Sequence, residues 1–330
     1  MAAVVSSAEI AIAVGSAGSA TGLGALRALT DWDAVARCLA CDINPSHLVA
    51  AVTDFAFLRV LPATSGDFAK SLSGDLSDRG ITAYYPIHDA EISAASKGRT
   101  IFSGCGVDVL APHGDAIAIV RDKLRMAEVF ASAHVPGPAT TRLDLAEWQG
   151  RALHVKPRTG VGSHGATAVR DAAGFALCKA SGDPELMIAQ PFVEGDEITI
   201  DAFCPSPGTV QAIACRERVE VKAGVSTKAR IFFDKGLADL TAQVSDALGL
   251  TGSFCHQVRG SPRGGWQVID VNPRIGGGTA MSVAVGLNFP AAHAAHFLGL
   301  DTTKFFKPLP NGDVFVVRSY REHVTCPASP

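Results

Sequence analysis

Three polar side chains at the end of one apolar segment are the first candidates for chemistry. Asp270 and Asn272 lie two residues apart in Val268–Asn272, so on a strand they point to the same face. Pro273 cannot donate a ladder hydrogen bond and should end that strand. Arg274 and three glycines follow at once. Because Mg²⁺ prefers oxygen ligands and arginine suits phosphate, the segment indicates a magnesium–phosphate site. A strand end with a polar turn is the alternative.

Two lysines and a glycine-rich loop lie upstream of this segment. Lys123 opens a predicted helix that runs to His134, and Lys156 ends a predicted strand just before the loop Gly160–Gly165. Backbone N–H groups and the hydroxyl of Ser163 in such a loop can surround a polyphosphate. The loop is not a P-loop, because it lacks the Gly-Lys-Ser/Thr sequence and is followed by a predicted strand. A lysine at its base strengthens the phosphate interpretation.

A third segment could hold a nucleoside. Gln190–Val193 is predicted to be extended, so its backbone could pair with the edge of an adenine. Glu197 follows and could accept ribose hydroxyls. The alternative is a linker between two subdomains that leads into a strand at Ile198–Phe203.

Composition excludes several classes of protein. The 330 residues carry 29 Lys and Arg against 32 Asp and Glu, a net charge of −3, which gives no basic face for nucleic acid or anionic lipid. With 47% hydrophobic residues the chain has an ordinary globular composition. No apolar run approaches the ~18 residues of a membrane span. The N-terminal stretch lacks the basic region of a signal peptide. We therefore expect a cytoplasmic protein.

The cysteines and two histidines do not predict a metal site. Eight scattered cysteines form no disulfide framework in a chain of this length. Cys38 and Cys41 have redox-motif spacing but fall in a predicted strand, where such positions face opposite sides. His293 and His296 fall on an alanine-rich predicted helix, where packing is the simpler interpretation.

The first hundred residues alternate strands with helices. Ile10–Val14 is a predicted strand, followed by a glycine turn, a helix and a second strand that ends in Asp42. Glycines followed by an acid about twenty residues later are typical of dinucleotide binding, but the spacing here is G-x-x-G-x-x-x-G. NAD binding is therefore a weak alternative. The alternation predicts a parallel α/β sheet.

Asp89 and Glu91 follow the predicted strand Ile81–Ile87. Ligands of such sheets bind beyond the carboxyl ends of the strands, so these acids could meet a cationic substrate group or Mg²⁺. Capping of a helix N-terminus is an equally good interpretation.

The motifs together resemble the ATP-grasp superfamily in their order and spacing. Lys123, Val155–Arg158 with the glycine loop, Gln190–Glu197 and Ile269–Arg274 carry the resemblance, which covers roughly residues 10 to 325. The carbamoyl-phosphate-synthase-like branch of single-unit proteins is most similar. Arg216–Lys228 resembles the arginine-rich strand pair of that branch, and residues 252–257 resemble its preceding metal strand. No internal repeat is visible.

This resemblance implies an α/β architecture of three parts. A parallel α/β pre-ATP-grasp domain would occupy residues 1–113. A small ATP-grasp subdomain with the glycine-rich loop would occupy 114–188, with a helical linker at 114–135. A large ATP-grasp subdomain with the metal site would occupy 189–330.

The resemblance also implies roles for individual residues. Lys123 and Lys156 would hold the α- and β-phosphates, and Glu197 the ribose. The remaining ATP contacts would come from the mobile phosphate loop and the adenine hinge: Gly160, Gly162, Ser163, Gly165, Gln190, Pro191, Phe192 and Val193. Gln257, Asp270 and Asn272 would bind Mg²⁺. If residues 253–259 and 265–271 form a hairpin, Gln257 lies opposite Asp270 and His256 faces the other side, but a bulge would exchange them.

Catalytic and substrate roles are less defined. Arg274 and Lys228 would stabilise the transferring phosphoryl group. Arg216, Arg218 or Lys222 could hold a substrate carboxylate, with a solvated strand face as the alternative. The general base stays open among Asp89, Glu91 and Glu220. The glycines around Gly277 would leave room for the acceptor substrate.

We predict a ligase that uses ATP and Mg²⁺, with Mn²⁺ as an alternative ion, to join a small-molecule carboxylate to an amine through an acyl phosphate. An ATP-grasp kinase or a carboxyphosphate- or carbamate-forming enzyme is the alternative. A non-catalytic nucleotide- or NAD-binding module is a third hypothesis. No nucleic acid or membrane partner is expected. A homodimer stays open, as do the identities of the acid and the amine.

Overall fold

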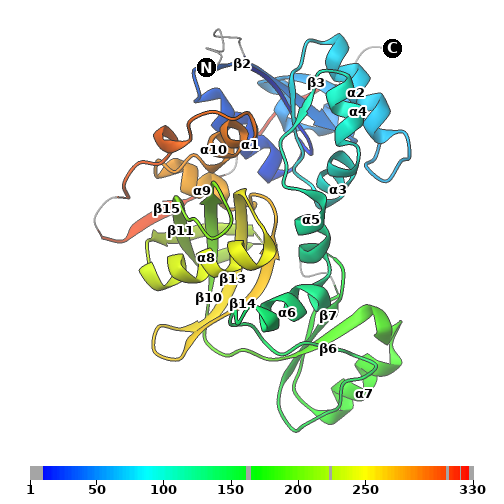
Figure 1. The fold of residues 1–330 in the computed structure, drawn as a ribbon, viewed down its shortest axis with the longest axis vertical. Coiled ribbons are helices and arrows are strands. Elements are labelled where there is room, and N and C mark those ends of the chain that lie inside the picture. Colours follow the sequence, from blue (N-terminus) through cyan, green and yellow to red (C-terminus); the bar gives the residue numbers. More distant parts are fainter. Residues whose placement is uncertain (1–9, 161–164, 223–224, 310–311, 320, 327–330) are drawn as a thin grey trace. The chain divides into compact units, whose positions relative to one another are not determined.

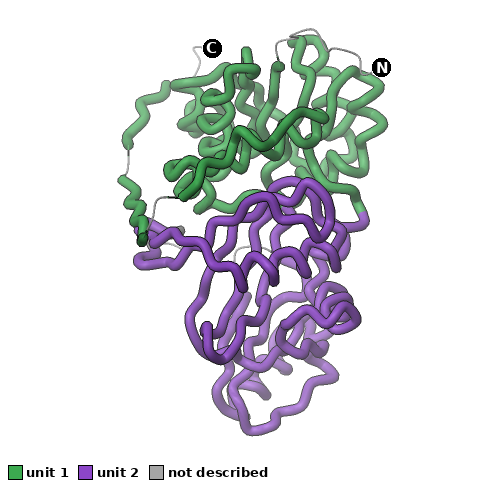
Figure 2. The backbone as a smooth tube through the Cα atoms, turned by 60° about the vertical axis from the view of Figure 1, so that its left-hand side comes forward, with its two compact units in different colours: residues 1–114, 274–330 green, residues 115–273 purple. Residues whose placement is uncertain are grey.

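The chain divides into two compact units (Figure 2). The computed structural model describes residues 10–160, 165–222, 225–309, 312–319 and 321–326. The first unit contains residues 1–114 and 274–330, and the second contains residues 115–273. Residues 274–330, which the sequence placed with a large subdomain, thus group with the N-terminal unit. The division into three functional parts stays a prediction.

The first unit is built on a parallel sheet (Figure 1), which confirms the α/β class expected for it. Its elements are β1 (Ile10–Val14), α1 (Ala20–Thr30), β2 (Val35–Asp42), β3 (Ala56–Arg59), α2 (Phe68–Asp78), β4 (Ala83–Tyr85), α3 (Asp89–Lys97), α4 (Arg99–Gly104), β5 (Asp108–Val109), α9 (Thr279–Ala284), α10 (Phe289–Phe297) and β15 (Val314–Val317). The strand order is β3-β2-β1-β4-β5. The order reverses between β1 and β4, which is where such sheets commonly bind ligands.

The turn after β1 depends on a glycine in the first turn of α1. Ser19 is the N-cap, and its hydroxyl accepts a hydrogen bond from the N–H of Gly22 at 3.0 Å. A Cβ on Gly22 would lie 2.2 Å from the carbonyl oxygen of Ser16, so a side chain cannot fit there. Glycine therefore lets α1 begin directly against the turn.

Asp42, the acid that a dinucleotide site would offer to a ribose, is used by the chain itself. One carboxylate oxygen accepts from the N–H of Gly18 at 2.7 Å. The other accepts from both the backbone and the side-chain N–H of Asn44, at 2.9 and 2.8 Å. With the carboxylate 5% exposed, these contacts explain its position without NAD.

The C-terminal helices belong to the same unit and pack beside α1 (Figure 1). Helix α10 begins at Phe289, because the side chain of Asn288 caps it and Pro290 fits its first turn. His293 is buried on this helix. Its Nε2 lies 3.0 Å from the carbonyl oxygen of Leu110, and its ring stacks on Tyr85 at 4.7 Å. Packing accounts for this histidine.

The C-terminal segment, residues 312–326, carries one short strand in its described part. This strand is β15, residues 314–317. Arg318 donates to the carbonyl oxygen of Gly277 at 2.6 Å. Further on, His323 contacts Thr53 and the Thr325 hydroxyl donates to the carbonyl of His47. After β15, side-chain hydrogen bonds to loops hold this segment.

The second unit carries two antiparallel sheets (Figure 1). Its elements are α5 (Gly114–Arg121), α6 (Lys123–Ser132), β6 (Thr141–Arg142), β7 (Leu153–Pro157), β8 (Thr167–Val169), α7 (Ala172–Ala180), β9 (Met187–Pro191), β10 (Asp196–Cys204), β11 (Ala212–Lys222), β12 (Val225–Phe232), α8 (Lys235–Leu248), β13 (Gly252–Ser261) and β14 (Gly265–Asn272). The smaller sheet has the order β6-β9-β7-β8, and α7 packs on it through Phe175.

The second unit contributes five neighbouring strands to the larger sheet, in the order β14-β13-β10-β11-β12. Alternate residues of its strands form an apolar face, which includes Ile198, Ile200, Val258 and Val268. This face packs against Leu237 and Val244 of α8. Because neighbours along a strand point to opposite faces, the intervening residues form a second face. The predicted hairpin is confirmed, with residues 262–264 in its turn. No helix of the described residues is long and apolar enough to cross a membrane.

Candidate active site

The second face of the larger sheet is polar, and pairing between strands arranges it in rows. One row contains Arg216, Thr199, Gln257 and Asp270. The next contains Ala214, Asp201, Cys255 and Asn272. Glu197, Arg259 and Gln267 form a third. Since directly paired residues share a face, most predicted metal, substrate and ribose residues of this unit lie on one surface.

The three predicted metal ligands lie at the β13–β14 end of these rows. Gln257 pairs directly with Asp270, as predicted, but through a register shift between Gln257 and Val258. Without that shift Gln257 would pair with Ile269, so the bulge brings Gln257 to Asp270 rather than replacing it with His256. The Asn272 amide lies 3.4 Å from Asp270 Oδ2. Among the described residues, no cluster of three or more His, Cys, Asp or Glu could hold a metal. One carboxylate and two amide carbonyls nevertheless fit Mg²⁺, which takes oxygen ligands and shares them with phosphates.

His256, the reserve metal ligand, faces away from this surface. It is fully buried and pairs with Val271, on the apolar face. The Thr241 hydroxyl donates to the Leu237 carbonyl at 2.7 Å, so it accepts from His256 Nε2 at 2.9 Å. Nδ1 is then the unprotonated nitrogen, and no described residue donates a hydrogen bond to it. Burial lowers the pKa of His256 to about 3, which keeps the ring neutral.

His256 should make folding stability sensitive to acid. Its folded pKa of about 3 lies below the ordinary 6.5, so its contribution is complete above pH 6.5 and is lost progressively as the pH falls to about 3. His256→Gln keeps a donor for Thr241 but cannot titrate there. Urea unfolding across this pH range should give a flatter curve for the variant. Parallel curves would show that His256 does not contribute this acid sensitivity.

Lys156 connects the two sheets of the second unit. It lies on β7 of the smaller sheet and is only 8% exposed, and its Nζ donates to the carbonyl of Ile269 on β14 at 3.0 Å. Burial lowers the pKa of Lys156, the Asp270 carboxylate opposes that shift, and Lys123 adds to it. The lysine thus lies between the predicted metal ligands and the second predicted phosphate lysine.

Lys123 is held at the start of α6 by the strand end that follows Lys156. Its backbone N–H donates to the Arg158 carbonyl at 3.0 Å, and its Nζ donates to the Gly160 carbonyl at 2.9 Å. Arg158 also binds both oxygens of Asp122, the N-cap of α6, at 2.8 and 2.6 Å. This pair keeps the pKa of Asp122 below its usual range. Lys123 and the glycine loop are therefore placed together.

Part of the phosphate loop can be described. Gly160 has φ 152° and Gly165 has φ 73°, and both are conformations that favour glycine. Gly162 and Ser163 lie outside the described residues. Their proposed phosphate contacts stay a prediction.

The hinge runs along the last residues of β9. Gln190 is buried, and its side-chain amide donates to the hydroxyl of Thr140 at 2.8 Å. The N–H of Phe192 donates to the Ala152 carbonyl at 2.9 Å. Pro191, Phe192 and Val193 line a hollow of about 680 Å³, together with residues of the β13–β14 hairpin.

Arg170 and Arg259, which the sequence motifs did not identify, lie near the hinge. The guanidinium of Arg259 lies 5.2 Å from the centre of the Phe192 ring, and that of Arg170 lies 5.4 Å from it. Arg259 also lies 3.3 Å from the carboxylate of Glu197, which forms an ion pair with Arg218 as well. Burial lowers the pKa of Arg218, and so does Arg259. Arg259 lies two residues after Gln257 on β13, so the two side chains share a face of the sheet. This spacing could have identified Arg259 from the sequence.

Two of the predicted cations of this unit, Arg216 and Lys228, are paired with acids. Arg216 is 3% exposed and lies 2.7 Å from Asp201, which forms a buried ion pair within the sheet. Lys228 lies 2.9 Å from Glu220, the acid considered as a base. The side chain of Lys222 lies outside the described residues. For Arg216, the contacts support a structural role more directly than substrate binding.

The first unit holds Arg274, Asp89, Glu91 and Gly277. Arg274 Nε donates to Asp89 Oδ1 at 2.8 Å. Glu91 accepts from the backbone N–H groups of Ser16, Ile87 and His88, so its contacts are those of the capping alternative. A Cβ on Gly277 would lie 3.6 Å from the hydroxyl of Thr21. The two predicted catalytic cations, Arg274 and Lys228, belong to different units.

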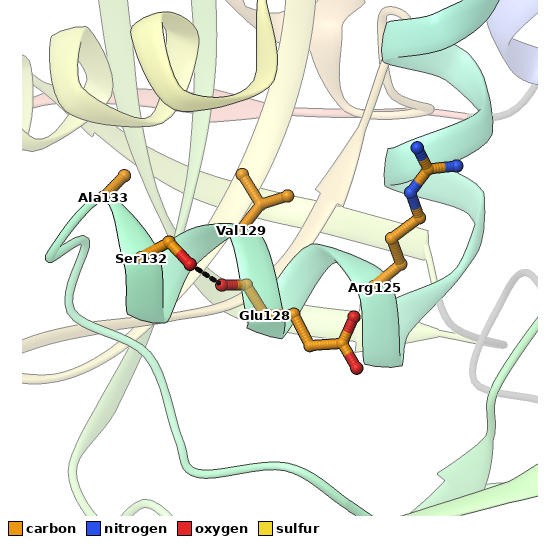
Figure 3. Close-up of a pocket in the computed structure, with 5 residues that line it drawn as sticks. All are labelled: Arg125, Glu128, Val129, Ser132 and Ala133. Carbon is orange, nitrogen blue, oxygen red and sulfur yellow. Dashed lines mark hydrogen bonds between the residues drawn. The ribbon is translucent and has the colours of Figure 1, made fainter.

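A second hollow, of about 410 Å³, lies on helix α6 (Figure 3). It is lined by Arg125, Glu128, Val129, Ser132 and Ala133, all from that helix. The Ser132 hydroxyl donates to the Glu128 carbonyl at 3.0 Å. None of the predicted site residues lines this hollow, so it does not belong to the candidate site.

Part of the chain is similar to a known protein family. Residues 183–319 match a family described as "ATP-grasp in the biosynthetic pathway with Ter operon". No curated protein matches the sequence.

Three solved structures share the fold, and each is only 14–15% identical to the chain, so they establish the fold alone. The biotin carboxylase domain of Hydrogenobacter thermophilus 2-oxoglutarate carboxylase, in complex with MgADP, ADP and bicarbonate, gives a TM-score of 0.68 over 87% of this chain and 69% of that one. N5-carboxyaminoimidazole ribonucleotide synthetase from Thermus thermophilus gives 0.69 over 93% and 82%. L-amino acid ligase from Bacillus licheniformis gives 0.68 over 89% and 76%.

Proposed function

We propose that this chain, an ATP-grasp protein by its fold and by the family that it matches, is an ATP-dependent ligase that joins a carboxylate to an amine. An acyl phosphate would be the intermediate, and ADP and phosphate would be released. The observation that carries the proposal is the position of Lys156. Its ammonium donates a hydrogen bond to the carbonyl oxygen of Ile269. Ile269 directly precedes Asp270, which pairs with Gln257 on the neighbouring strand.

The nucleotide would bind between the two sheets of the second unit. Lys123 and Lys156 would contact its phosphates, because charge-assisted bonds to phosphate are stronger than neutral ones. The hollow along Pro191–Val193 would take the base, and Glu197 the ribose hydroxyls. Glu197 is already paired with two arginines, so these cations would fix the orientation of its carboxylate.

Gln257, Asp270 and Asn272 would hold Mg²⁺, which supplies charge neutralisation for the triphosphate when bound. The single carboxylate leaves most of the coordination to phosphate oxygens and water. A solved structure of the same fold contains MgADP. Mn²⁺ has the same ligand preferences and stays an alternative.

The reaction would proceed by two displacements. A carboxylate oxygen of the acid attacks the γ-phosphorus, and the bond from that phosphorus to the β–γ bridging oxygen breaks as ADP leaves. The acceptor, after its ammonium loses a proton to water, attacks the acyl carbon with its neutral nitrogen. The carbon–oxygen bond to phosphate breaks, and the nitrogen gives up a second proton to the departing phosphate or water as the amide forms. Arg274 and Lys228 would stabilise the negative charge that develops on the transferring phosphoryl group. They would also hold this group in position for attack.

A trapping experiment tests this proposal. The purified chain is incubated with ATP, Mg²⁺, hydroxylamine and a panel of carboxylic acids, and ADP and hydroxamate are measured by mass spectrometry. A ligase should give hydroxamate in step with ADP for its own acid. A stable phosphorylated product would instead identify a kinase. ADP release that requires bicarbonate would identify a carboxyphosphate-forming enzyme.

A further inference from the structure

The carboxyl edge of the parallel sheet in the first unit forms a second site-like feature. Strand order reverses between β1 and β4, and the loops after these two strands diverge there. The loop after β1 leads into α1, and the loop after β4 leads into α3, whose first residue is Asp89. Asp89 is therefore at the place where sheets of this topology leave room for a ligand.

Glu91 fixes the two loops to each other. Its Oε1 accepts from the N–H of Ser16, on the loop after β1, at 3.0 Å. Its Oε2 accepts from the N–H groups of Ile87 and His88, on the loop after β4, at 3.1 and 3.0 Å. Burial raises the pKa of Glu91, and these backbone bonds oppose that shift. Because Glu91 bonds the two loops to each other, the backbone that carries Asp89 is held in place.

Asp89 itself has one occupied and one available oxygen. Arg274 Nε donates to Oδ1 at 2.8 Å, and the Asp89 side chain is 11% exposed. No described residue donates to its second oxygen, Oδ2, which is not among the buried atoms that lack a partner. The carboxylate is thus mostly enclosed, oriented by a guanidinium, and open at a single atom.

We propose that Asp89 binds the ammonium group of the acceptor amine through Oδ2, while Oδ1 holds Arg274. A carboxylate oriented in this way favours a primary ammonium, which offers charge and several donors to a single oxygen. The inference rests on the proposed ligase function, because Arg274 is the residue assigned to the transferring phosphoryl group. It narrows the acceptor to amines that are cationic before they react. Asp89 is assigned binding only, not proton transfer.

Hydroxylamine separates this role from acid activation, because it is largely uncharged near neutral pH and does not need an ammonium site. Asp89→Asn keeps a carbonyl oxygen for Arg274 but removes the negative charge. We expect its KM for the best cationic amine found with the wild-type chain to rise about 10- to 100-fold, the equivalent of a lost charged hydrogen bond. Hydroxamate formation at saturating acid should fall far less. Asp89→Glu should recover part of the amine affinity.

Asp54→Asn is a matched control, because Asp54 pairs with Arg27 on the surface of the same unit at 3.4 Å. It should leave the amine KM unchanged. If Asp89→Asn leaves the amine KM unchanged, or lowers the amine and hydroxylamine rates equally, Asp89 is not an amine site. If the wild-type chain forms no hydroxamate with any acid, the proposed ligase function fails first and this inference fails with it.

Discussion

Asp270→Ala is expected to reduce ATP-dependent product formation on the order of 10²- to 10³-fold. Asp270 is the only carboxylate among the three predicted metal ligands, and it pairs directly with Gln257 and contacts Asn272. Its loss removes the negative charge that would hold Mg²⁺ against the triphosphate, and electrostatic contributions of this kind reach that size. The measurement is ADP release under saturating ATP, Mg²⁺ and acid, with hydroxylamine as acceptor.

Asp239→Ala provides the control for this variant. Asp239 lies on α8, in the same unit, with its side chain 61% exposed and paired with Lys235. Its replacement should leave turnover unchanged. If Asp270→Ala retained wild-type ADP release, the metal site would not lie on this strand, and the proposed catalytic surface would be wrong.

Lys156→Met should weaken ATP binding about 10- to 100-fold, because a charged hydrogen bond to phosphate is lost. The stability of the nucleotide-free protein should respond differently. Burial lowers the pKa of Lys156, so its charged form is costly inside the protein and methionine removes that cost. We therefore expect an unfolding temperature at or above that of the wild type without ATP, and a smaller rise when ATP is added.

Lys179→Met distinguishes a phosphate lysine from a structural one. Lys179 also donates to backbone carbonyls, those of Asp144 at 2.9 Å and Ala146 at 3.0 Å. Its loss should lower stability without changing ATP affinity. A Lys156→Met variant that is destabilised but binds ATP normally would behave as Lys179 is expected to, and would remove Lys156 from the nucleotide site.

The polar surface of the larger sheet was predictable where local sequence determines it. The turn at residues 262–264 predicted the hairpin, and alternation with Gln257 predicted the inward position of His256. The register shift between Gln257 and Val258, which places Gln257 opposite Asp270, was not visible in the sequence. The parallel α/β character of the first unit followed in the same way from alternating strand and helix patterns. These features depend on neighbours within about twenty residues.

Contacts between distant segments were not predictable. Asp89 and Arg274 are 185 positions apart, and Asp122 and Arg158 are 36 apart, so no local period connects them. The acids that pair with Arg216 and Lys228 were not foreseen either, although both cations were selected. The type of a side chain was visible in the sequence, but which partner satisfies its charge depended on the tertiary fold.

The transfer of oxygen from the acid to phosphate tests the ligase proposal most directly. The acid identified by hydroxylamine trapping is labelled with ¹⁸O in its carboxylate, and the phosphate released with ATP, Mg²⁺ and amine is analysed by mass spectrometry. An acyl phosphate predicts one ¹⁸O atom in each phosphate, because the carboxylate oxygen that attacks phosphorus leaves with it. Phosphate without label, formed at the same rate as the amide, would contradict the account.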